Sequence, residues 1–348
     1  MNEYLVDETV KRYIREYDRY KKLTEIVSNL CLTIVQKNLT IRATVQYRTK
    51  TPTSLAEKIR KSTKYKSIDN VFDEMNDLAG VRIIIYQEAD RRKVVEEIQR
   101  VFIGKNNEKV KIKIKDKDGI EGKYYKATHC LVVLSPEYIV DNFSLKKTPC
   151  EIQICSLLSH VYNEIEHDLQ YKPRTGSLSS KEKILIKQLG LITKSGDIII
   201  RKLLEATNER LKFHTGEFLD VHDFTIRMGN LLKIGDLFSN NAGLLYDEII
   251  NLKLDSPEII ISTLLDREEN LVEVANQEYE KILEFMNRRN INIIIDRNSS
   301  DLLLLVLLRR KSSLIFNNDF LISKRDHSSR LLEIAFTYKE MIAEFENL

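Results

Sequence analysis

The sequence of 348 residues has few of the residues that interrupt regular structure. Five prolines and eleven glycines exclude collagen-like and linker-rich architectures and predict long uninterrupted helices. The four cysteines show no C-x-x-C spacing, which excludes a zinc ribbon and a disulfide framework and favours a reduced, cytoplasmic protein. The longest aliphatic run, at residues 302–308, is far shorter than the roughly 20 residues of a membrane-spanning helix, so we expect no membrane partner.

Charge is distributed unevenly along the chain. Residues 1–175 contain 32 Lys and Arg against 25 Asp and Glu, a net charge of +7, whereas residues 176–348 contain 23 against 27, a net charge of −4. A basic N-terminal half favours anionic partners such as nucleotides, phosphates or RNA. The alternative is a solvated surface that is unevenly charged and binds nothing.

The periodicity of apolar residues changes near residue 180. Before it, alternating and β-branched segments predict strands between helices. The expected strands are 40–47, 81–86, 109–115, 124–134 and 149–155, and the expected helices are 3–38, 51–62, 89–102 and 156–171. Beyond it nearly every segment has a helical period, with one candidate strand at 291–295. We therefore predict an α+β domain at residues 1–215, followed by a mainly α-helical domain at residues 216–348 whose role the sequence does not indicate.

Lysine alternates with aliphatic residues over residues 109–115, in the order K-V-K-I-K-I-K. This period of two is typical of a half-buried strand, and lysines on the outward side protect an edge strand from pairing with another chain. We prefer that interpretation to a nucleic-acid-binding patch.

Five polar or cationic residues surround the end of the first expected strand and the start of the next helix. Arg48 and Lys50 are two residues apart in a strand and so share one side, and Ser54, Lys58 and Lys61 follow at helical spacing. Such a convergence suits a polyphosphate. The alternative is a solvated helix face.

Carboxylates accompany two of the expected strands. Asp77 precedes the strand at 81–86, Gly80 is predicted to permit close approach of another backbone, and Arg82 within the strand needs an anionic partner. Glu151 and Gln153 share one side of the strand at 149–155. Brought together, Asp77 and Glu151 would suit one Mg2+, which takes one or two carboxylates. The alternative is a structural pair of Asp77 with Arg82.

Further polar side chains occur near a strand and on a helix. Tyr125 and the nearby Lys126 and His129 would suit a nucleotide, through stacking on its base and contacts to its phosphates. His160, Glu164 and His167 lie three or four residues apart, on one helix face. Their spacing is not the H-E-x-x-H of zinc proteases, so we expect a polar face that bonds to the site. We also discount His222-Asp223 as a hydrolase pair, because no further metal ligands surround it.

In this order the motifs resemble the RelA/SpoT-type alarmone synthetase domain. They are R-x-K-x-x-x-S-x-x-x-K from Arg48, D-x-x-G-x-R from Asp77, Y-x-x-x-H from Tyr125, E-I-Q-I from Glu151, and H-x-x-x-E-x-x-H-x-x-x-Y-K from His160. The resemblance covers roughly residues 40–200 and extends to nothing in the C-terminal part.

The resemblance implies a nucleotidyltransferase-like mixed sheet with flanking helices. It also implies transfer of the β,γ-pyrophosphate of ATP to the ribose 3′-hydroxyl of GDP or GTP, which makes (p)ppGpp. By similarity, ATP is bound by Arg48, Lys50, Ser54, Lys58, Lys61 and Arg82. By similarity, the acceptor is bound by Tyr125, Lys126, His129 and Gln153. Asp77 and Glu151 would be catalytic and would bind Mg2+, with His160, Glu164 and His167 as a supporting helix face.

Departures from the family pattern leave alternatives open. Cys155 replaces an arginine that usually follows E-I-Q-I, which removes one phosphate-binding cation. One alternative is therefore a toxic relative that places pyrophosphate on the 3′ end of uncharged tRNA or on adenosine nucleotides. Another is a binding fold without catalysis. We expect no DNA partner. Small synthetases of this type often form homo-oligomers through their terminal helices, but the C-terminal part of this chain differs, so a homo-oligomer is left as an open expectation.

Overall fold

The computed structural model describes residues 3–116, 124, 126–139, 143–171, 177–317 and 330–346. The chain forms two compact units. The N-terminal unit consists of Met1–Val35 and Arg42–Leu203, and the C-terminal unit consists of Gln36–Ile41 and Leu204–Leu348. The boundary between the compact units lies within one long helix, α6 (Ser180–Leu211). The predicted domain boundary after residue 215 stays a prediction.

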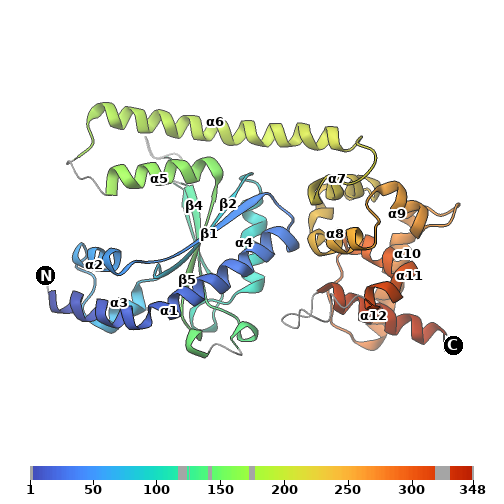
Figure 1. Cartoon of the computed structure of the whole chain (residues 1–348), viewed down its shortest axis with the longest axis horizontal. Helices are drawn as coiled ribbons and strands as arrows, with labels where there is room; N and C mark the ends of the chain where they lie inside the picture. Colours follow the sequence, from blue (N-terminus) through green and yellow to red (C-terminus); the bar gives the residue numbers. More distant parts are fainter. Residues whose placement is uncertain are drawn as a thin grey trace. The chain divides into compact units, whose positions relative to one another are not determined.

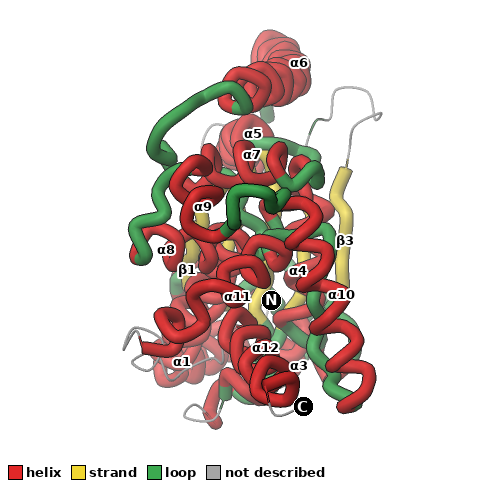
Figure 2. Tube along the Cα trace, turned by 90° about the vertical axis from the view of Figure 1, so that its right-hand side faces the viewer, coloured by secondary structure: helices red, strands yellow, loops and turns green. Residues whose placement is uncertain are grey.

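A five-stranded mixed sheet forms the centre of the N-terminal unit. Its order is β1-β2-β5-β4-β3, and the strands are β1 (Ala43–Thr49), β2 (Ala79–Ile85), β3 (Lys111–Asp116), β4 (Lys126–Val132) and β5 (Cys150–Ser156). Only the pairing of β2 with β5 is parallel, and β1 and β3 lie at opposite edges (Figure 2). The expected α+β class and mixed sheet are confirmed. The first and fourth strands are shorter than expected, because pairing, and not β propensity, sets their ends.

Helix α1 (Glu3–Thr33) packs on β1 and β2 and buries one of its faces completely. Tyr13, Leu23 and Val27 of this face are 0% exposed. A π-helical turn at Ile34–Asn38 follows, so the helix expected over 3–38 changes its winding near the end. Cys31 is buried near Cys130 and Cys150, and all four cysteines are free thiols. Burial of Cys31 raises its pKa, so this thiol stays protonated.

Four more helices flank the sheet, namely α2 (Pro52–Arg60), α3 (Ile68–Glu74), α4 (Asp90–Val101) and α5 (Leu157–Tyr171). Thr51 caps α2 by accepting a hydrogen bond from the backbone of Ser54, and Pro52 occupies the first turn, where its missing N–H costs nothing. Helix α6 runs alongside α5 (Figure 1), where the Ser156 hydroxyl donates to Asp197 at 3.0 Å.

In the described residues of the C-terminal unit, the regular secondary structure consists of helices. Its helices are α7 (Val221–Leu231), α8 (Ala242–Asn251), α9 (Pro257–Leu264), α10 (Leu271–Arg289), α11 (Asp301–Asn317) and α12 (Arg330–Glu346). The aliphatic run at 302–308 is buried in the middle of this unit. The candidate strand at 291–295 is wrong, because that segment pairs with no strand within the described parts of the chain. Among the described residues, no helix is both long and apolar enough to cross a membrane.

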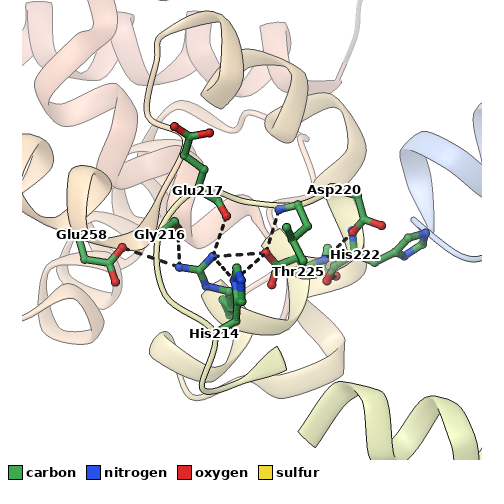
Figure 3. A network of polar contacts seen from close by, with 10 residues as sticks. His214, Gly216, Glu217, Asp220, His222, Thr225 and Glu258 are labelled. Atoms are coloured by element: carbon green, nitrogen blue, oxygen red, sulfur yellow. Dashed lines mark hydrogen bonds and ion pairs between the residues drawn. The ribbon is translucent and has the colours of Figure 1, made fainter. Parts of the chain in front are cut away.

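A buried ion pair organises the loop before α7 (Figure 3). Arg227 and Asp223 are only 3% and 1% exposed, and Arg227 Nη1 lies 3.3 Å from Asp223 Oδ2. The guanidinium also donates to the carbonyl oxygen of Gly216 at 2.8 Å, and Asp223 Oδ2 accepts the backbone N–H of Leu219 at 3.0 Å. Asp223 is therefore a structural anion, in agreement with the decision not to assign a hydrolase pair to His222-Asp223.

Replacing Arg227 with Ala is expected to destabilise the C-terminal unit by about 3–5 kcal/mol, because Asp223 is then left buried without its countercharge. Urea unfolding of the full chain measures the change. Arg267→Ala is the control, because Arg267 is exposed and surface changes usually stay within about 0.5 kcal/mol. Equal unfolding midpoints for the two variants would contradict the structural role of Arg227.

Candidate functional site

Strand register places the candidate residues in two rows across one face of the sheet, here called the site face. Laterally paired residues of neighbouring strands point to the same side. The first row, called the Arg82 row, contains Gln46, Arg82, Gln153, His129 and Lys113. The second row, called the Glu151 row, contains Arg48, Gly80, Glu151, Leu131 and Lys111. The sheet thus brings together residues that are up to about 100 positions apart in the sequence.

Glu151 is held by two neighbours on the site face. His129 Nδ1 lies 3.0 Å from Glu151 Oε1, and Gln153 Nε2 donates to Glu151 Oε2 at 2.9 Å. A carboxylate only accepts hydrogen bonds, so His129 carries its proton on Nδ1. Burial alone would raise the pKa of Glu151, but these two partners outweigh burial and lower the pKa, so the side chain is an anion at neutral pH.

Asp77 is held by two lysines from different elements. Its Oδ2 accepts hydrogen bonds from Lys50 Nζ at 2.9 Å, at the end of β1, and from Lys58 Nζ at 2.7 Å, on α2. Burial opposes ionisation of this carboxyl, yet the charges of Lys50 and Lys58 lower its pKa. The other oxygen, Oδ1, is buried and has no hydrogen-bond partner among the residues that the structure describes. That oxygen is therefore available to a cation.

Gly80 leaves a gap between Arg48 and Glu151 in the Glu151 row. A Cβ atom there would lie 3.7 Å from the Arg48 carbonyl oxygen and 3.9 Å from that of Glu151, which are ordinary contact distances. The expectation that Gly80 permits close backbone approach is therefore wrong. What its missing side chain provides is open space on the site face beside Glu151.

Arg82 contacts helix α5 at the other side of the site. Its Nη1 lies 2.8 Å from Glu164 Oε1 and 3.1 Å from His160 Nδ1. Burial, and next the charge of Arg82, lower the pKa of His160, so the ring is neutral and its Nδ1 accepts the hydrogen bond. Two of the three helix residues therefore bond to the site face. His167 is instead exposed, and its Nδ1 lies 3.7 Å from its neighbour Asp168.

Three of the described candidates lie away from the centre of the site. Lys126 alternates out of phase with His129 and pairs with Glu88 at 3.2 Å, on the opposite side of β4. Ser54 lies exposed in the first turn of α2, and Lys61 lies exposed at its C-cap. Tyr125 lies outside the described residues.

Two residues of the Arg82 row escaped the sequence reasoning. Gln46 lies beside Arg82, and Lys113 lies beside His129. The alternation of Lys and Ile near Lys113 was visible, but alternation alone does not indicate which face of a sheet a residue joins. Cys155 is buried with Ile84 and Ala127 in a small apolar cluster, so it supplies no charge.

The carboxylates suit a small divalent cation only when phosphate oxygens of a bound nucleotide and water complete its coordination. Asp77 precedes β2, and Gly80 near the start of that strand is paired with Glu151, so both carboxylates belong to the same end of the β2–β5 pair. Within the part of the chain that the structure describes, no three His, Cys, Asp or Glu side chains form a metal cluster. One or two carboxylates are what Mg2+ takes from a protein when phosphate oxygens and water complete its shell. Asp77, with its unpartnered Oδ1, fits that chemistry.

Residues 47–176 match the family described as "Region found in RelA / SpoT proteins". Similar solved structures include a GTP pyrophosphokinase family protein from Streptococcus pneumoniae, with 19% identity, a TM-score of 0.47 and coverage of 57% of this chain and 96% of that chain. Another is the small alarmone synthetase 1 from Bacillus subtilis, with 22% identity, a TM-score of 0.46 and coverage of 57% and 98%. None of the curated proteins matches the chain.

The family match thus confirms, for residues 47–176, the RelA/SpoT resemblance found in the sequence. The match includes every residue of the two rows except Gln46, and it leaves the C-terminal unit without an assigned family.

Replacing Lys58 with Met is expected to raise the pKa of Asp77, because one of its two countercharges is lost. A depressed pKa stabilises the fold above the unfolded value of about 4, and that stability is lost as pH falls through the folded pKa. The variant should therefore lose less stability on acidification. The carboxyl 13C shift of Asp77 against pH measures the pKa. Lys61→Met is the matched control on the same helix, and an equal pKa in both variants would contradict the pairing.

Proposed function

We propose that the N-terminal unit transfers the β,γ-pyrophosphate of ATP to the ribose 3′-hydroxyl of GDP or GTP. In this reaction the 3′ oxygen attacks the β-phosphorus, and the bond from that phosphorus to the oxygen bridging the α-phosphate breaks. AMP leaves, and the hydroxyl proton passes to Glu151 or to water. The observation that carries the proposal is that Glu151, Arg48 and Arg82 share one face of the sheet, at the end of β2 that Asp77 precedes.

Phosphoryl-type transfer depends mostly on positioning and on neutralising charge, and the site face offers both. Arg48, Lys50, Lys58 and Arg82 supply cations for the phosphates of ATP. Lys50 and Lys58 now bind Asp77, so binding of ATP would exchange one anionic partner of these lysines for another. Asp77 and Glu151 would hold Mg2+, and the ion would supply positive charge to the phosphate oxygens.

Glu151 is a weak base, because its partners keep its pKa low. A weak base contributes little proton transfer from an ordinary hydroxyl near neutral pH. Its anionic form instead orients the acceptor, and the hydrogen bonds from His129 and Gln153 fix its two oxygens. We therefore propose that His129 and Gln153 position Glu151, and that they affect the acceptor only through Glu151.

The acceptor is the least determined part of this proposal. Stacking of its base on Tyr125 and a contact to Lys126 stay predictions from the sequence, and Lys126 would have to leave Glu88 to make that contact. The 3′ end of an uncharged tRNA and adenosine nucleotides are the alternative acceptors, and transfer to tRNA would make the protein a translation-blocking toxin.

Two wider expectations belong to the same proposal. The buried free thiols and the use of ATP favour the cytoplasm. A homo-oligomer stays a prediction. Apolar side chains on the outer sides of α5 and α6, such as Val161 (46% exposed) and Ile192 (67% exposed), are compatible with it. The molar mass of the chain in solution tests it, and a monomer at working concentrations would contradict it.

Transfer of γ-labelled phosphate from ATP tests the function. With Mg2+, label is expected on GDP or GTP, and Asp77→Asn or Glu151→Gln should lower the rate by at least about a hundredfold, which is about 2.7 kcal/mol of transition-state stabilisation. Glu57→Gln, a carboxylate on α2, is the control and should keep full activity. Label on tRNA or adenosine nucleotides alone would show that the acceptor is not GDP or GTP. Label on none of these acceptors would refute the proposed function.

A further inference from the structure

Two lysines of the edge strand β3 continue the site face beyond His129. Lys113 is paired with His129 in the Arg82 row, and Lys111 is paired with Leu131 in the Glu151 row. Since paired residues share a side of the sheet, both ammonium groups are on the side that carries Glu151 and Arg82. The lysines are therefore part of the same surface as the candidate site.

The packing of β3 does not explain this arrangement. Ile114 lies on the other side of the strand and is 71% exposed. Burial of an aliphatic side chain therefore does not explain the alternation of Lys and Ile at this position. The expected strand is present, but the expectation that its aliphatic side is buried is wrong at Ile114. Within the described residues, Lys111 and Lys113 are exposed and have no ion-pair or hydrogen-bond partner. Both cations are available to an external anion.

Spacing across the sheet indicates which anion these cations suit. Neighbouring strands lie about 4.8 Å apart, so the backbones of Lys111 and Glu151, two strands apart, are separated by about 10 Å. Extended Lys and Glu side chains that lean toward each other cover part of this distance, so a hydroxyl at Glu151 and a phosphate near Lys111 and Lys113 can belong to one nucleotide. The 3′-hydroxyl and the 5′-phosphate of a nucleotide have this relation, with only a few covalent bonds between them.

We propose that Lys111 and Lys113 bind a phosphate group of the acceptor, on the side of His129 that is remote from ATP. The proposal rests on the proposed function for the position of the hydroxyl, and it adds two specificity-determining residues to that site. Lys ammonium groups bind phosphate as strong charge-assisted donors. The phosphate chain of a nucleoside diphosphate or triphosphate supplies such a group, and so does the phosphodiester next to the 3′-terminal ribose of an RNA.

Binding measured without turnover separates this proposal from the function itself. In equilibrium dialysis, the Lys111→Gln, Lys113→Gln double variant should bind GDP and GTP about tenfold more weakly than the native chain, from the loss of charged hydrogen bonds. Guanosine, which has no phosphate, should bind both proteins equally. The Lys111→Arg, Lys113→Arg double variant should restore most of the affinity, because it keeps both charges.

Lys22→Gln is the matched control, because Lys22 is an exposed lysine of α1 that lies outside both rows. A short RNA with a free 3′-hydroxyl forms a second arm that identifies the source of the phosphate. If the Gln double variant binds only the RNA more weakly, the bound phosphate is that of a phosphodiester. If it binds only GDP and GTP more weakly, the bound phosphate is that of a free nucleotide. Equal binding of every phosphate-bearing acceptor by the Gln double variant and the Lys22→Gln control would overturn the proposal, even if transfer activity is found.

In the transfer assay, the Gln double variant should raise the KM for the phosphate-bearing acceptor about tenfold and leave kcat nearly unchanged, since the interaction exists before and during the reaction. A fall in kcat at constant KM would contradict a binding role for these lysines. If the native chain transfers no label but the dialysis difference persists, the function fails and the phosphate site stands.

Discussion

The register between the two parallel strands β2 and β5 is the constraint on which the candidate site depends. It sets Arg82 beside Gln153 and Gly80 beside Glu151. A slip of one residue would move Glu151 and Gln153 to the opposite side, where Ile152 and Ile154 are now fully buried. Burying two charged or polar side chains in place of two isoleucines would cost several kcal/mol. The apolar alternation that builds the core therefore also fixes the polar alternation of the site face.

Electrostatics then determines the state of the carboxylates. Each one is partly removed from water, which by itself favours the neutral acid, and each one is nevertheless kept ionised by partners. Asp77 depends on mobile ammonium groups, whereas Glu151 depends on His129 and Gln153, which are fixed in strands. The site thus has one rigid anion and one whose partners can exchange for phosphate. The rigid anion, Glu151, is the one proposed to orient the acceptor, and the anion with exchangeable partners, Asp77, lies beside the lysines proposed to bind ATP.

Much of this site was predictable from the sequence, because alternation within single strands is a local property. It predicted that Glu151 shares a side with Gln153, and the order of the motifs predicted the family. The contacts of Asp77 with Lys58 and of Arg82 with Glu164 join distant segments, and no local pattern predicts such pairs. The expected place of Lys126 beside His129 is wrong, because the two residues are three apart in a strand and therefore point to opposite sides.

The apolar pattern of α5 shows a second limit of the same reasoning. Leu157, Val161, Ile165 and Leu169 recur every four residues, which predicts a face packed on the protein. In the structure they are 37–46% exposed. The pattern correctly predicted the helix but not what covers it, because amphipathicity shows that a face prefers to leave water and does not name the surface it packs against.

The central claim is that Asp77 and Glu151 form one cation site in the presence of ATP. Paramagnetic line broadening by Mn2+, recorded on the isotope-labelled full chain with a non-hydrolysable ATP analogue, tests it most directly. The account predicts that amide signals next to Asp77 and Glu151 broaden first, and that those next to the exposed His167 and Asp168 stay sharp. Broadening centred on His167 and Asp168, or the same broadening in the Asp77→Asn variant, would contradict it.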